Sequence, residues 1–159
     1  MKKTGYTVLV LCLVLAGVFF VNHMTGNKKS VDDGSLQKGD FLYEALENEK
    51  LAGIGEKLPC EIHVVRDDNG LQECADLTDP EDVKAAAEAF MQIRVGEETD
   101  VYVTDRYHSI SFIFEAGEKI VIPLNDTNLE WIKNDKCKLY ELEGIYDFWE
   151  TAYQSESGR

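Results

Sequence analysis

Hydrophobic residues follow three patterns along this chain, and each pattern predicts a different kind of structure. The first is a continuous apolar run, Tyr6–Val21, close to the N-terminus. Further along, some apolar residues recur every three to four positions, which is typical of a helix with one buried face. Others alternate with polar residues, which is typical of strands with one buried face. The chain therefore predicts an N-terminal apolar segment followed by a mixed helical and strand domain.

The apolar run lies within a longer stretch, Thr4–Asn27, that contains no charged side chain. A helix of about 24 residues is roughly 36 Å long, enough to cross a hydrocarbon core of about 30 Å. The run alone is shorter, so spanning needs the flanking polar residues and the lysines at both ends. We predict a basic tail at residues 1–5, a single transmembrane helix at residues 6–27 and, because residues 28–39 are small and polar, a flexible stalk.

Two other interpretations of the apolar run stay open. Lys2 and Lys3 also suit the start of a cleaved signal peptide, but Phe19–Val21 are bulky where a cleavage site has small residues. Lipid attachment at Cys12 is disfavoured, because Leu11 stands where a bacterial lipoprotein signal has a small residue. The flanking lysines nearly balance, so they do not decide the orientation. A short tail followed by a signal-like segment favours a domain outside the cytoplasm, at the cell membrane.

The remaining residues, 40–159, have the size of one domain with a single core. The clearest helical signal is Asp79 followed by Pro80, which suits a first turn, and Gly96 is a suitable end for that helix. The predicted elements are a helix from Phe41 capped by Asp40, strands at Glu61–Arg66 and Leu71–Ala75, a helix from Pro80 to Ile93, strands at Val101–Thr104, Ser109–Phe114, Ile120–Leu124, Leu129–Ile132 and Cys137–Leu142, and a helix at Gly144–Tyr153. This order predicts an α+β fold with helices packed on one face of a meandering antiparallel sheet.

Three cysteines follow the apolar run, and an odd number cannot pair completely within one chain. Asp67–Gly70 predicts a hairpin turn, and if Arg66 faces Leu71 then Cys74 faces His63. Cys60 is then roughly 10 Å from Cys74, beyond the reach of a disulfide. Cys137 is left as a possible partner of either one, and the choice between them stays open.

The charge of the chain restricts its partners. All 30 Asp and Glu residues follow residue 29, whereas four of the 16 Lys and Arg residues lie within residues 1–29, so the remainder carries a formal charge of about −18. Nucleic acids and anionic membrane surfaces require a positive protein face, and both are therefore excluded as partners of the domain. Partners that remain compatible are the membrane through its single span and a protein or peptide at the cell envelope.

The sequence contains no catalytic or metal-binding motif such as G-x-S-x-G, C-x-x-C or H-x-x-x-H. His108 and Ser109 are adjacent on a strand and so point to opposite faces. The remaining enzyme hypothesis is a thiol enzyme that uses Cys74 and His63, and a metal bound by those two residues with His108 is a weaker one. We predict no enzyme activity, no cofactor and no metal.

Aromatic residues are numerous for a small domain, and tyrosine and tryptophan are enriched in protein interfaces. Those on the polar face of the sheet are candidates for an interaction surface. The residues assigned to this surface are Tyr102, Tyr107, Trp131 and Tyr140.

Four segments between Leu77 and Gly144 support a resemblance: TDPEDVKAAAEAF, TDRYHSISFIF, KIVIPL and LYELEG. In this order they resemble small envelope domains of Gram-positive bacteria, a family of unknown function whose members follow a lipoprotein signal or a membrane anchor. The resemblance implies an extracytoplasmic location and transfers no functional residue. The expected function is a non-enzymatic, membrane-tethered module that binds a protein or peptide, with a structural or assembly role at the envelope as the alternative.

Overall fold

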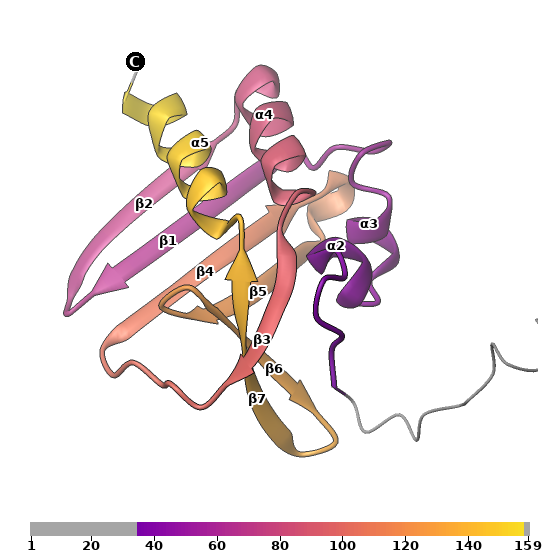
Figure 1. Cartoon of the computed structure of the whole chain (residues 1–159). Helices are drawn as coiled ribbons and strands as arrows, with labels where there is room; N and C mark the ends of the chain where they lie inside the picture. The colour runs from indigo at the N-terminus through magenta and orange to yellow at the C-terminus, as the bar shows by residue number, and fades with distance from the viewer. Residues whose placement is uncertain (1–34, 158–159) are drawn as a thin grey trace, which may run out of the picture. The chain divides into compact units, whose positions relative to one another are not determined.

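The structure is a computed structural model that describes residues 35–157 (Figure 1). The predicted tail, the predicted transmembrane helix and residues 28–34 of the predicted stalk lie outside the described residues. Within residues 35–157, no helix has the length and hydrophobicity required to cross a membrane. The last residues of the predicted stalk contact the domain: the backbone N–H of Leu36 donates to the Tyr140 hydroxyl at 3.1 Å, and Gly39 N–H donates to the Val95 carbonyl at 2.7 Å.

The described residues form an α+β fold around one seven-stranded antiparallel sheet, which confirms the predicted fold class. The strands are β1 (Glu61–Asp68), β2 (Leu71–Leu77), β3 (Arg94–Thr99), β4 (Arg106–Ile113), β5 (Lys119–Asn125), β6 (Asn128–Lys133) and β7 (Lys136–Glu143). The helices are α2 (Leu42–Ala45), α3 (Glu49–Ala52), α4 (Pro80–Phe90) and α5 (Ile145–Ser157), with a 3₁₀ turn at Glu115–Gly117. The strand order is β2-β1-β4-β5-β6-β7-β3, so the sheet meanders only from β4 to β7.

Helices α4 and α5 lie side by side over the β1 and β2 end of the sheet (Figure 1). The sequence explains α4 locally: the Asp79 carboxylate accepts the Glu81 N–H at 3.0 Å, and Pro80 occupies the first turn. Its apolar side chains at helical spacing are buried against the sheet, as predicted; they are Val83, Ala86, Ala87 and Phe90. Facing them, alternate residues of the strands fill the core, namely Ile62, Val64, Ile110, Phe112, Ile122 and Leu124. We call this side of the sheet the inner face and the opposite side the outer face.

The prediction of one helix from Phe41 capped by Asp40 is wrong in detail. Two short helices replace it, α2 with Phe41 at its N-cap position and α3 with Asn48 at that position. The Asn48 side chain accepts the N–H groups of Lys50 and Leu51 at 3.0 and 3.3 Å. A capping side chain inside the predicted helix therefore begins a second one.

The prediction that Gly96 ends the helix is wrong. Helix α4 ends at Phe90, and Gly96 lies within β3, next to an irregularity in the pairing between β3 and β7. A Cβ atom at residue 96 would lie 2.8 Å from the backbone oxygen of Glu141. Glycine is required here because the two backbones approach each other closely.

The predicted strand at Val101–Thr104 is also absent. Residues 100–103 carry no regular structure, and the connection from β3 to β4 runs across the end of the β5–β6 hairpin. Instead of a ladder, side-chain amides hold it: Val103 N–H donates to the Asn125 Oδ1 at 2.8 Å, and Asn125 Nδ2 donates to the Val103 carbonyl at 2.8 Å. The alternating residues therefore form no strand here, and the backbone groups of Val103 bond to a side chain instead.

The register of the first hairpin differs from the prediction by two positions. Asp68 faces Leu71, and the turn is Asn69–Gly70, with positive φ angles of 56° and 80°. Both central residues of a type I′ turn need positive φ, and Asn-Gly supplies it at low cost. Cys74 consequently faces Val65, and His63 faces Asp76, whose carboxylate is in contact with the His63 ring Nδ1.

Strands β5 and β6 diverge after two residue pairs. Leu124 faces Leu129 and Asn125 faces Asn128, and no further pairs join the two strands. Pro123, predicted to lie at an edge or strand end, is in the part of β5 that pairs with β4 alone. The missing N–H of proline is tolerated there, because no β6 carbonyl lies opposite it.

Candidate functional site

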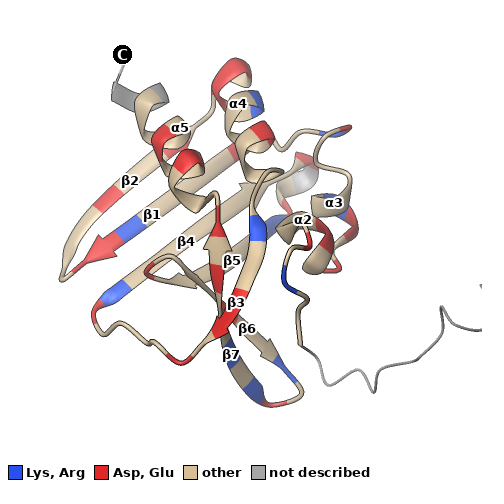
Figure 2. Cartoon of the chain, viewed as in Figure 1, with Lys and Arg blue, Asp and Glu red and all other residues tan. Residues whose placement is uncertain are grey.

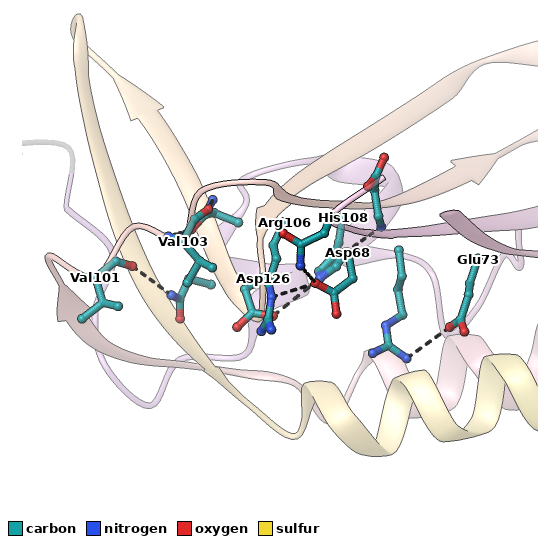
Figure 3. Close-up of polar contacts among 12 residues, drawn as sticks. Asp68, Glu73, Val101, Val103, Arg106, His108 and Asp126 are labelled. Atoms are coloured by element: carbon teal, nitrogen blue, oxygen red, sulfur yellow. Dashed lines mark hydrogen bonds and ion pairs between the residues drawn. The ribbon is translucent and has the colours of Figure 1, made fainter. Parts of the chain in front are cut away.

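A polar cluster joins three segments at one end of the sheet: the β1–β2 turn, the start of β4 and the β5–β6 turn (Figure 3). Arg106 connects the two turns, since its Nε lies 3.0 Å from Asp68 Oδ1 and its Nη1 lies 3.5 Å from Asp126 Oδ1. A backbone hydrogen bond joins the first turn to the start of β4 as well, since Asn69 N–H donates to the Asp105 carbonyl at 2.9 Å. Residues distant in sequence are thus held together at this end.

His108 is the buried member of this cluster, on the inner face of β4. Its Nδ1 accepts the backbone N–H of Asp67 at 3.1 Å, so in the neutral ring the proton lies on Nε2, which is 3.6 Å from Asp126 Oδ1. Burial lowers the pKa of His108, and the hydrogen bond and negative charge of Asp126 oppose that effect. The neutral form is favoured, and the ring edge packs against Trp149 with ring centroids 5.8 Å apart.

A groove of about 800 Å³ lies between α5 and the β1–β2 hairpin. The Arg66 guanidinium lies 5.7 Å from the rings of both Trp149 and Tyr153 and 3.7 Å from Glu73. Arg66 is the one positive residue among those that line the groove, and it has both aromatic and acidic partners within the chain. The arrangement stabilises the packing of α5 on the hairpin and leaves no uncompensated positive charge in the groove for an anionic ligand.

The four residues assigned to an interaction surface fall into two groups. Tyr102 and Tyr107 lie on the outer side, 51% and 54% exposed, and their hydroxyls hydrogen-bond to each other. The hydrogen bond with Tyr107 is the largest cause that raises the pKa of Tyr102 to about 12, followed by burial and then by the electrostatic effects of Tyr107 and Glu130. We call Tyr102 and Tyr107 the tyrosine pair.

Trp131 and Tyr140 are not part of this pair. The Tyr140 side chain is 2% exposed and lies in the core, opposite Leu129. Trp131 is partly buried and packs against the core from β6. The structure thus brings together two of the four predicted surface residues and separates the other two from them.

Other exposed apolar residues lie near the tyrosine pair or on the same side of the sheet. They are not among the residues predicted to form the interaction surface. They are Val101, Val121 and Ile132. The sequence carries a weak signal, because Val121 and Ile132 alternate with the inward-facing residues Ile122 and Trp131 of β5 and β6. Without the sheet order, that alternation does not show which outward residues lie near one another.

The thiol-enzyme hypothesis loses its geometric basis in this fold. Cys74 and His63 are not opposite each other, and Cys60, Cys74 and Cys137 are all exposed free thiols. His63 and His108 occupy alternate positions on β1 and β4 that face opposite sides of the sheet. Within residues 35–157, no group of three or more His, Cys, Asp or Glu side chains is placed to bind a metal ion.

Charge is unevenly spread over the described residues. Figure 2 shows acidic residues along α4, α5 and the first two strands, whereas basic residues gather on the β6–β7 hairpin. These basic residues are largely paired: Lys133 lies 3.6 Å from Glu47, and Lys138 lies 2.9 Å from Glu98. The domain as a whole therefore presents an acidic surface.

A scan against protein-family models and searches of curated proteins and of solved structures found no match to this chain.

Proposed function

We propose that residues 35–157 form a non-enzymatic domain that binds a protein or peptide, tethered outside the cytoplasm by a membrane anchor at residues 6–27. The observation that carries this proposal is the tyrosine pair, two half-exposed aromatic residues on the outer side of the sheet. Tyrosine offers a large apolar surface with few rotatable bonds, so binding it costs little conformational entropy.

The surrounding structure holds both residues of the tyrosine pair in place. Tyr102 lies on a connection that Asn125 and Asn128 hold to the β5–β6 hairpin, and Tyr107 lies on a central strand. Anchoring residues held in this way are already positioned before a partner arrives, which is typical of interface hot spots. The net acidic charge of the domain favours a partner with basic residues.

Site-specific photo-crosslinking in intact cells tests the proposal. A benzophenone amino acid replaces Tyr102 or Tyr107, and, as a matched control, Tyr146 on α5, which is 66% exposed. We expect a reproducible crosslinked protein from positions 102 and 107 and none from position 146. An identical pattern from all three positions, or no adduct from any, would contradict the proposal.

The membrane tether is tested separately. An epitope tag at the C-terminus, followed by membrane fractionation and protease treatment of intact cells, reports both anchoring and side. We expect the tag in the membrane fraction and its loss on treatment. A tag that resists protease until the cells are lysed would place the domain on the other side.

A further inference from the structure

The diverging strands β5 and β6 leave backbone groups without strand partners. Beyond Leu124 and Leu129 the two strands are not paired, although β5 continues back to Lys119 and β6 continues to Lys133. We call the space between Lys119–Pro123 and Glu130–Lys133 the β5–β6 gap. Such strand edges are the sites at which an extended peptide can be added to a sheet.

Hairpin geometry shows which groups point into the gap. Asn125 and Asn128 flank a two-residue turn, so they exchange backbone hydrogen bonds with each other. Because direction alternates along a strand, Val121 of β5 and Glu130 and Ile132 of β6 direct their N–H and C=O groups into the gap. Lys133 and Lys136 flank the next two-residue turn, so the backbone groups of Lys133 and of the other odd-numbered residues of β6 point toward β7. The even-numbered residues of β6 therefore point into the gap, which agrees with the first hairpin.

The gap opens into an apolar groove of about 290 Å³. Leu46, the residue that follows α2, and Leu51 of α3 line it together with apolar residues of β5 and β6. This volume is at the lower end of ligand pockets and suits one or two aliphatic side chains. Glu130 is the one charged residue among those that line the groove, and it lies near Tyr102 of the tyrosine pair. Lys119 and Lys133 lie at the outer ends of the gap, and Lys133 lies 3.6 Å from Glu47.

We propose that the β5–β6 gap binds an extended, basic peptide segment of a partner protein as an inserted strand, an assignment that rests on the proposed function. The peptide backbone hydrogen-bonds to the edge of β5 at Val121, an aliphatic side chain enters the groove, and Lys or Arg residues of the peptide face Glu130. Charge complementarity argues for this occupant over a second copy of the chain. A second copy would bring another domain of about −18 formal charge against the first.

The test uses a fluorescent peptide of the sequence Lys-Val-Lys-Leu-Lys-Val-Lys, acetylated and amidated at its ends. Binding to the full chain, purified in detergent, is measured by fluorescence anisotropy. Two control peptides keep the length: one is methylated on alternate backbone nitrogens, and one carries Glu in place of every Lys. We expect the first peptide to bind and each control to bind at least about tenfold more weakly, because hydrogen bonds or charge pairs are lost.

Two protein variants give the matched comparison. Val121→Pro removes one N–H that points into the gap and leaves the β4–β5 ladder intact, whereas Val121→Thr keeps that N–H and the strand preference. Val121 is 51% exposed, so neither change alters the core. We expect V121P to weaken binding about tenfold and V121T to leave it within about threefold. Circular dichroism and urea unfolding verify the fold of both.

The outcomes separate this proposal from the proposed function. Absence of binding at millimolar peptide concentration, or equal binding of the methylated peptide, would overturn strand insertion. The comparison of methylated with unmethylated peptide uses the natural chain, so it remains a valid test even if V121P fails to fold. If strand insertion fails while positions 102 and 107 still crosslink a protein in cells, the domain binds its partner by another surface. If the peptide inserts but no cellular protein crosslinks, the proposed function fails.

Discussion

Asn125 shows how one buried side chain can replace a stretch of sheet. Both atoms of its amide bond to the backbone of Val103, at 2.8 Å each, and the residue is fully buried. Asn128 makes a weaker contact of the same kind, with Nδ2 3.4 Å from the Val101 carbonyl. The two amides fix the connection that carries Tyr102.

We expect Asn125→Ala to lower the free energy of unfolding by about 2–4 kcal/mol, because two part-buried backbone groups of Val103 lose their partner. Asn128→Ala is the matched control and should cost about 1 kcal/mol or less, since its single contact is long. Urea unfolding measures both. Equal costs for the two variants would show that Asn125 has no special role.

His108 makes the stability of the domain depend on pH. Its folded pKa lies below its ordinary value of 6.5, with burial as the main cause. The groups around it are Asp126, Asp68, Arg66 and the Asp67 N–H. The unfolded chain therefore binds the proton more readily, so this contribution to stability is complete above about pH 6.5 and is lost as the pH falls through the folded pKa.

We expect the free energy of unfolding of the natural chain to fall between pH 7.5 and 5.5. His108→Gln should flatten that fall, because glutamine does not titrate and its carbonyl can still accept the Asp67 N–H. His63→Gln is the control and should retain it. An H108Q chain with the same pH dependence as the natural one would assign the fall to other groups.

At the scale of elements, the contact between β3 and β7 depends on a glycine. Adding a Cβ at Gly96 would place it 2.8 Å from a backbone oxygen, which cannot move without shifting β7. We expect Gly96→Ala to destabilise the domain by about 1–3 kcal/mol, as other overpacking changes do.

Gly53→Ala is the matched control for this change. Its nearest contact would be 3.4 Å and its φ is −93°, so alanine is accommodated. Its effect should stay within about 0.5 kcal/mol. Thermal and urea unfolding of both variants provide the measurement, and a tolerated G96A would mean that the strands separate easily.

At the scale of the whole molecule, the excess of acidic residues acts against the compact state. Like charges spread over one domain repel each other, and added salt screens them over about 10 Å at 0.1 M. We expect the melting temperature to rise by about 2–4 °C between 20 and 300 mM NaCl at pH 7.5. The effect should shrink toward pH 4.5, where the net charge of the chain approaches zero. A fall in melting temperature with salt would indicate that attractive pairs dominate.

The sequence predicts an element correctly where its structure depends on residues close together in the chain. Helix α4 follows from Asp79, Pro80 and the spacing of its apolar residues, and the β5–β6 turn follows from Asn125–Asn128. The candidate surface was predictable to the same extent: Tyr102 and Tyr107 were identified as outward aromatics, but their contact with each other was not. Tyr140 could not be separated from them, because alternation alone does not distinguish an exposed face from a buried one.

The sequence alone is enough to predict the α+β class, most of the strands and the acidic character of the domain, since these depend on residue type and short-range spacing. Three features follow only from the folded chain: β3 pairs with β7, Cys74 faces Val65, and β5 and β6 separate to form a gap. Strand pairing joins residues far apart in the chain, and a shift of two positions in one hairpin preserves every inward and outward side chain. The local pattern is identical for both registers, so the choice rests with the turn and with packing across the sheet.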